Sequence, residues 1–105
     1  MKILIDDIQK LNYFLKEDNF HESILVKFST KWCSPCKKLQ NVINDFDKER
    51  PDVLILEIDA EKSFEISQDP AFNILSVPTI FLFKNGELLR RVEGYIDLES
   101  LKKIF

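Results

Sequence analysis

The sequence predicts an α/β fold, a three-layer α/β/α sandwich in which a mixed β sheet lies between two layers of helices. Short apolar runs typical of buried strands, such as Ile24–Ser29 and Val53–Ile58, alternate with segments whose apolar residues recur every three or four positions. Apolar strands separated by helices favour parallel crossovers and a sheet covered on both faces. Near the C-terminus, Asn85-Gly86 joins two apolar runs and predicts an antiparallel hairpin.

The N-terminal part of the chain begins with a short strand, expected over Ile3–Ile5. A helix over 7–18 follows, because Ile8, Leu11 and Leu15 are spaced by three and four residues. The run Ile24–Ser29 is the next strand.

A longer helix is expected over 34–49, with Pro35 tolerated in its first turn. Pro51-Asp52 is typical of a loop and separates this helix from the strand Val53–Ile58. The apolar stripe of the helix consists of Leu39, Val42, Ile43 and Phe46.

The C-terminal part has shorter elements. A short helix is expected over 61–68, and Asp69-Pro70 predicts an N-cap that starts another brief turn. Strands over Thr79–Phe83 and Leu88–Val92 flank the hairpin turn. Asp97 is expected to cap a last helix, so that the order is β-α-β-α-β-α-β-β-α. Its apolar positions are Leu98, Leu101, Ile104 and Phe105.

Composition narrows the class of protein. The 105 residues predict a single domain, 1–105, and a hydrophobic fraction of 45% argues against disorder. A net charge of −3 gives no case for nucleic acid binding. The sequence has no signal-peptide pattern and no apolar run long enough to cross a membrane. We therefore expect a cytoplasmic protein, in which a close cysteine pair is catalytic or metal-binding rather than structural.

The segment Trp32-Cys33-Ser34-Pro35-Cys36-Lys37 contains the only two cysteines. Their spacing allows a small disulfide ring to close and reopen, and such a pair can carry two electrons to or from another protein. The pair falls where a strand ends and a helix begins. A helix N-terminus carries partial positive charge and free N–H groups, which favour the reactive thiolate.

A metal site is the alternative use of two cysteines. A structural zinc site within one chain needs about four ligands, and His21, the only histidine, is remote in sequence from the pair. We therefore expect no metal in a single chain, although a metal bridged between two chains is left open.

The chain resembles the thioredoxin family over nearly its full length. The resemblance rests on the segment from Trp32 to Lys37, on Val77-Pro78-Thr79, on Phe83-Lys84-Asn85-Gly86 and on Gly94 before the last helix. The usual family motif has Gly at the position of Ser34. The resemblance implies a thioredoxin-like fold and a thiol–disulfide oxidoreductase that reduces protein disulfides.

The resemblance also implies residue roles. Cys33 would be the nucleophile and Cys36 the resolving thiol, with a redox-active Cys33–Cys36 disulfide. Trp32, Val77, Pro78 and Gly94 would bind substrate, Pro78 following a cis peptide bond, while Ser34 and Pro35 shape the site. No cofactor is expected. Disulfide-containing proteins and a thioredoxin reductase are the implied partners, and a monomer is the implied state.

Lys27 departs from the family pattern, since thioredoxins usually have a buried Asp six residues before the first cysteine. They also usually have a Lys where this chain has Ile55. In one interpretation Lys27 reaches the surface or pairs with a carboxylate such as Glu57 or Asp59. In the other it points beneath the active site and tunes the cysteine pair.

These departures leave room for a second function. The chain could be a thioredoxin-fold binding module, or a specialised redox partner with an atypical redox potential. The motif from Trp32 to Cys36 and the Val77-Pro78-Thr79 segment favour the oxidoreductase.

Overall fold

A five-stranded mixed sheet, with strand order β1-β3-β2-β4-β5, forms the centre of the protein in a computed structural model that describes residues 1–18 and 20–105. β1, β3 and β2 are parallel, while β4 and β5 run antiparallel to their neighbours. The elements are β1 (Lys2–Leu4), α1 (Ile8–Asn12), the π-helical segment η1 (Tyr13–Glu17), β2 (Ser23–Ser29), α2 (Ser34–Glu49), β3 (Val53–Asp59), α3 (Phe64–Ser67), β4 (Thr79–Lys84), β5 (Glu87–Glu93) and α4 (Leu98–Ile104).

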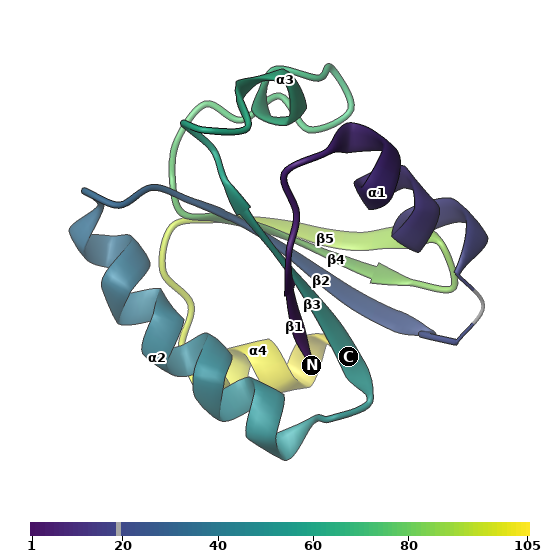
Figure 1. Cartoon of the computed structure of the whole chain (residues 1–105). Coiled ribbons are helices and arrows are strands. Elements are labelled where there is room, and N and C mark those ends of the chain that lie inside the picture. The colour runs from purple at the N-terminus through teal and green to yellow at the C-terminus, as the bar shows by residue number, and fades with distance from the viewer. Residues whose placement is uncertain (19) are drawn as a thin grey trace.

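The helices cover both faces of the sheet, as the sequence predicts. Figure 1 shows α1 and α3 on one side of the strands and α2 and α4 on the other. Because side chains alternate along a strand, β2 sends Ile24, Val26 and Phe28 into the core beneath α1 and α3. Leu25 of the same strand packs in the core beneath α2 and α4.

Most expected elements are confirmed to within a residue or two, including a helix over Ser34–Glu49. The hairpin turn is also confirmed: Asn85 and Gly86 both have positive φ, 52° and 80°, as the favoured two-residue turn requires. Asp97 caps α4 by accepting a hydrogen bond from the Ser100 N–H at 2.8 Å.

Two helices differ from the prediction. The helix expected over 7–18 is α-helical only from Ile8 to Asn12 and then widens into η1. The helix expected over 61–68 is reduced to Phe64–Ser67. There the Asp59 carboxylate accepts hydrogen bonds from the Glu61 and Lys62 N–H groups, at 3.0 and 3.1 Å. This turn occupies the residues that the helix would have needed.

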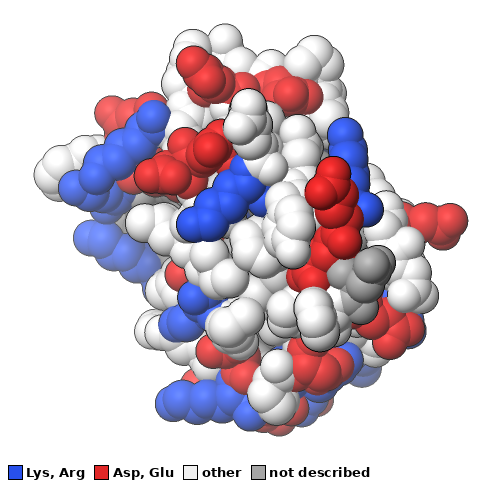
Figure 2. Space-filling view, turned by 45° about the vertical axis from the view of Figure 1, so that its right-hand side comes forward, with Lys and Arg blue, Asp and Glu red and all other residues white. Residues whose placement is uncertain are grey.

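Charged residues of both signs are interspersed on the surface that Figure 2 shows, consistent with the small net charge. In the part of the chain that the structure describes, no helix is long and apolar enough to span a bilayer. The single histidine, His21, is half-buried, and its Nδ1 lies 2.6 Å from a carboxylate oxygen of Asp18.

Candidate active site

The two cysteines lie at the N-terminus of α2, just beyond the end of β2. Cys33 is the N-cap residue, with an extended backbone (φ −93°, ψ 109°), and Ser34 and Pro35 form the start of the helix. The Cys36 N–H donates to Cys33 Sγ at 3.1 Å. This hydrogen bond and the positive end of the helix both favour negative charge on the Cys33 sulfur.

Cys33 and Cys36 are joined by a disulfide, with their Cα atoms 5.1 Å apart. The two residues differ in exposure: Cys36 is buried at 5% relative exposure, and Cys33 is only partly buried. Another molecule can therefore reach the Cys33 sulfur more readily than the Cys36 sulfur. This asymmetry follows from the helix, because Cys36 lies one turn inside it.

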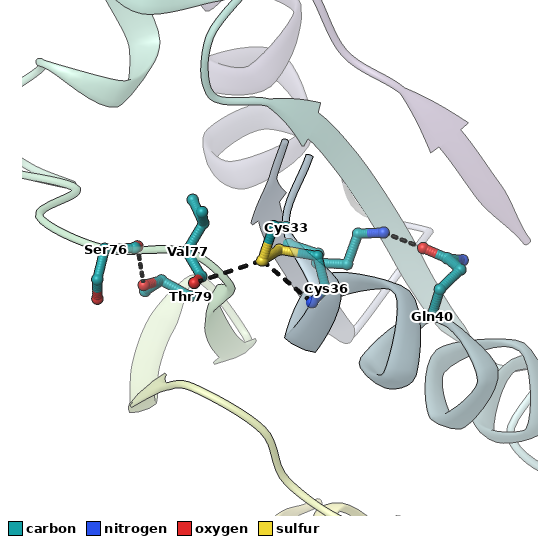
Figure 3. Close-up of a disulfide and its surroundings, with 7 residues drawn as sticks. Cys33, Cys36, Gln40, Ser76, Val77 and Thr79 are labelled. Atoms are coloured by element: carbon teal, nitrogen blue, oxygen red, sulfur yellow. Dashed lines mark hydrogen bonds between the residues drawn. A yellow bond between two sulfur atoms is a disulfide. The ribbon is translucent and has the colours of Figure 1, made fainter. Parts of the chain in front are cut away.

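A backbone segment from the far end of the chain faces the disulfide (Figure 3). The carbonyl oxygen of Val77 lies 3.6 Å from Cys33 Sγ. The Val77–Pro78 peptide bond is cis, which confirms the expectation from the resemblance. Thr79 Oγ1 donates to the Ser76 carbonyl oxygen at 2.8 Å, and the Gly94 N–H donates to the Pro78 carbonyl oxygen at 2.8 Å. These bonds fix the segment on both sides of Pro78.

Trp32, next to the disulfide, is 85% exposed. Trp32 therefore lies at the surface rather than in the core, where another molecule can reach it.

A cavity of about 350 Å³ adjoins the facing segment. Its lining comes from three parts of the chain: Thr30 before the cysteines, residues of α3 and its approach, and the segment that ends at Val77. Two of its large apolar side chains, Phe64 and Leu75, are exposed by 59% and 78%. A partly apolar surface thus lies beside the disulfide.

Lys27 is buried and ion-paired beneath α2. Its side chain is 5% exposed, and its Nζ lies 2.9 Å from the Glu57 carboxylate on the neighbouring strand. The Nζ also donates to Gln40 Oε1, the bond that ends at Gln40 in Figure 3. Gln40 in turn donates to Asn44 Oδ1 at 3.0 Å. Each side chain in this chain of contacts has a polar partner.

Each of the two interpretations of Lys27 drawn from the sequence agrees with part of this arrangement. The expected pairing with Glu57 is confirmed, and the expected position under the redox helix agrees with the bond to Gln40. The interpretation that Lys27 reaches the surface is wrong, because Lys27 is only 4% exposed and its Nζ contacts Glu57 and Gln40. Ile55, the other departure from the family pattern, is fully buried and pairs in register with Leu25.

Sequence reasoning missed two residues near the site. Gln40 comes four residues after Cys36, so it lies on the same face of α2 one turn further on. That spacing was visible in the sequence. Arg91 on β5 contacts the segment that leads to Val77, and no sequence pattern pointed to this contact.

Thiol–disulfide exchange with another protein needs a sulfur that the other protein can reach and a second sulfur close to it. This site has a partly exposed sulfur, a buried sulfur joined to it and a backbone segment facing them. By fold and site the protein is a thiol–disulfide oxidoreductase. The Thioredoxin family model matches residues 6–105, and the chain belongs to the thioredoxin family. Members of this family are protein-disulfide oxidoreductases, and this chain has their paired cysteines.

Individual relatives agree with this assignment. The chain is 38% identical over 95 residues to a thioredoxin of Chlamydia muridarum, covering 86% of this chain and 91% of the relative. It is 33% identical over 97 residues to a thioredoxin of Staphylococcus haemolyticus, covering 84% and 88%. The crystal structure of a thioredoxin from Nicotiana alata superposes with a TM-score of 0.84 at 29% identity, covering 98% of this chain and 89% of that one.

The exchange reaction of the family proceeds on the two sulfurs without a prosthetic cofactor. Among residues 1–18 and 20–105, no group of three or more His, Cys, Asp or Glu side chains is placed to hold a metal ion.

Proposed function

We propose that the protein reduces disulfides in other proteins, with Cys33 as the nucleophile and Cys36 as the resolving thiol. The Cys33 thiolate attacks a substrate disulfide, forms a mixed disulfide and releases one substrate thiolate. The Cys36 thiolate then attacks Cys33 Sγ and releases the second. Two electrons and two protons pass to the substrate, and the Cys33–Cys36 disulfide remains.

The observation that carries these roles is the difference in exposure between the sulfurs. Cys33 is partly exposed and receives the Cys36 N–H, whereas Cys36 is 5% exposed. A buried thiol is poorly placed to meet a bulky substrate but well placed to attack a neighbour three residues away. The reverse assignment would require the substrate to enter the core.

We further propose that the substrate lies as an extended segment between Trp32 and the Val77–Pro78 segment. An extended peptide can bond to exposed backbone groups in the manner of strand addition. The Val77 carbonyl oxygen, 3.6 Å from Cys33 Sγ, supports this placement. In this proposal Gly94, whose N–H bonds to the Pro78 carbonyl oxygen, supports the substrate-binding segment from one side. Ser34 and Pro35, at the start of α2, shape the site on the other side.

Lys27 is proposed to tune the cysteine pair. Gln40, its hydrogen-bond partner, lies one helical turn beyond Cys36 on α2, which supports a position of the Lys27 charge close to Cys36. The contact with Glu57 supports a charged lysine whose effect is largely balanced. The balance between these two charges then influences how stable the Cys36 thiolate is.

The location of the protein, its oligomeric state and its electron donor are also matters of proposal. We infer that the protein works in the cytoplasm as a monomer and receives electrons from a thioredoxin reductase. The relation to bacterial thioredoxins supports these inferences.

Insulin reduction tests the function. The wild-type protein should reduce insulin disulfides with dithiothreitol or a thioredoxin reductase as electron source, and Cys33→Ser should abolish turnover. Cys36→Ser should retain the attack but accumulate a mixed disulfide with insulin, which Cys33→Ser should not form. Accumulation on Cys36 instead would reverse the roles. Wild-type inactivity with both electron sources, despite a disulfide that forms, would favour the binding module.

A further inference from the structure

Arg91 reaches from β5 to the loop that connects α3 to β4, residues 68–78. Its Nη1 donates to the carbonyl oxygen of Phe72, and its Nη2 donates to that of Asn73 at 3.0 Å. The contact joins segments 18 and 19 residues apart in sequence. One side chain thus binds two consecutive backbone carbonyls, and it does so through a planar guanidinium whose donors are held in a fixed fork that an ammonium group does not have.

The guanidinium is itself held in place. It lies over the ring of Phe81, 5.0 Å from the ring centroid, and Phe81 is 2% exposed in the core. The Glu93 carboxylate lies 3.1 Å from Nη2. Contacts with the ring and the carboxylate fix the direction of the donors before they meet the loop, so the loop gains a rigid anchor rather than a mobile one.

The anchored loop has an unusual backbone. Asn73 has a φ of 46°, in the left-handed region that few residues other than glycine adopt. The next residue, Ile74, donates its N–H to the Ser67 carbonyl oxygen at 3.0 Å. Arg91 therefore binds the loop where its direction changes, between the buried Phe72 and the exposed Leu75.

The residues that come after this point in the chain form the surface beside the disulfide. Ile74, Leu75, Ser76 and Val77 all line the cavity of about 350 Å³. Val77 is four residues after Asn73 and places its carbonyl oxygen 3.6 Å from Cys33 Sγ. The position of these side chains relative to the disulfide thus depends on where the preceding carbonyls are held.

We propose that Arg91 is a positioning residue for protein substrates. By holding the Phe72 and Asn73 carbonyls, it presents Ile74–Val77 to the extended peptide that carries the substrate disulfide. Arg91 does not act on the exchange between sulfurs, because its contacts are with the loop, Phe81 and Glu93 rather than with either cysteine. This inference rests on the proposed function at the same site.

The prediction separates binding from chemistry. Arg91→Met removes both hydrogen bonds to the loop, so kcat/KM for insulin should fall about five- to tenfold, mainly through KM. The rate with a small disulfide, dithiobis(nitrobenzoic acid), and the Cys33–Cys36 reduction potential should be unchanged, because the hydrogen bonds of Thr79 and Gly94 hold the backbone beside Cys33 without Arg91. Arg91→Lys keeps a positive charge but replaces the fixed fork of donors with a single ammonium group, so it should lose part of the insulin activity.

Arg90 supplies a matched control. It is the preceding residue on β5, is exposed, and faces the opposite side of the sheet. Arg90→Met should leave the insulin kinetics, the rate with the small disulfide and the reduction potential at wild-type values. This control separates the clamp, by which we mean the two bonds from Arg91 to the Phe72 and Asn73 carbonyls, from a general loss of positive charge on this strand.

Hydrogen exchange provides a readout that does not depend on activity. The Ile74 amide, bonded to Ser67, should exchange faster in Arg91→Met than in the wild type, while amides of β2 should not. Unchanged insulin kinetics with unchanged exchange at Ile74 would overturn the proposal, as would an equal loss of rate with the small disulfide. If Arg91→Met does not fold, Arg91→Lys decides by the same readouts. Wild-type failure on insulin would instead count against the proposed function, and the exchange measurement would still test the clamp.

Discussion

The two faces of the sheet differ in what they bury. On the face covered by α1 and α3, Phe28 packs against the rings of Phe72 and Phe81, with centroids 5.4 and 5.7 Å away. On the face covered by α2 and α4, the core is also apolar, but β2 carries Lys27 there, the only charged residue that is buried in the described part of the chain. The first face buries rings without a buried charge among them, whereas the second places a compensated charge pair beneath the helix that carries the disulfide.

The largest expected effect on stability comes from the apolar face. Phe28→Ala should lower the free energy of unfolding by about 3–5 kcal/mol, because it leaves a cavity among rings that cannot collapse fully. Since Phe28 lies on the face away from α2, the reduction potential of the refolded protein should change by no more than about 10 mV. Urea unfolding and redox titration measure the two quantities.

A shift of several tens of millivolts in Phe28→Ala would break the distinction between the faces. If this variant is too unstable to titrate, Phe28→Leu, with an expected loss of about 1 kcal/mol, gives the same comparison.

The ion pair should respond unequally to the loss of either partner. Glu57→Gln leaves Lys27, 5% exposed, without a counter-charge and should cost about 3 kcal/mol of unfolding free energy. Lys27→Met should cost less, because Glu57 is 23% exposed and water can solvate it. The double variant Lys27→Met/Glu57→Gln should lose less than the sum of the two single losses, because neither charge is left without its partner.

A double-mutant cycle by urea unfolding measures this coupling. Purely additive losses in the double variant would show that the two side chains do not act as a pair.

The same two single variants should shift the reduction potential in opposite directions. Glu57→Gln leaves an unbalanced positive charge, which stabilises the thiolate of the reduced form and makes the potential less negative. Lys27→Met leaves a carboxylate and makes it more negative. Shifts of tens of millivolts are expected, about 1.4 kcal/mol for each 30 mV. Two unchanged potentials, or shifts of the same sign, would show that Lys27 does not tune the cysteine pair.

A smaller effect is expected from the hydrogen-bonded pair Asp18 and His21, which comes just before β2. A hydrogen bond from His21, then one from the Phe20 N–H, holds the pKa of the Asp18 carboxyl below its usual range. A carboxylate whose pKa is lowered by folding stabilises the fold at pH values above its pKa in the unfolded chain, which is about 3.9. This stability is lost as the pH falls through the pKa of the folded state.

Asp18→Asn should therefore reduce the unfolding free energy at neutral pH by about 1 kcal/mol and flatten its decline in acid. The reduction potential should be unaffected, since the pair is remote from α2. An acid decline as steep as that of the wild type would show that Asp18 is not its source.

Much of this structure could be predicted because it depends on local patterns. The α2 helix follows from its apolar period and Pro35, and the hairpin follows from Asn85-Gly86. The position of the cysteines at a helix N-terminus follows from the strand before them and the helix after them.

The parts that could not be predicted depend on side chains that meet across the fold. The Asp59 carboxylate caps the turn before α3 and so shortens that helix. Asp59 is the last residue of a strand, and nothing in the sequence indicated that its side chain would bond to the backbone that follows. Glu57 was one of two carboxylates available to Lys27, and only strand register places it alongside. Arg91 meets the Phe72 and Asn73 carbonyls through the path of a loop without regular structure.

The reduction potential of the Cys33–Cys36 disulfide tests most directly the claim that the protein reduces other proteins. Equilibration of the purified protein with glutathione or dithiothreitol buffers, followed by quantification of the free thiols, gives its value. We predict a potential near the roughly −270 mV that serves as the reference value for thioredoxin. A potential near the roughly −120 mV of a strong dithiol oxidant would contradict this claim and reverse the direction of electron flow.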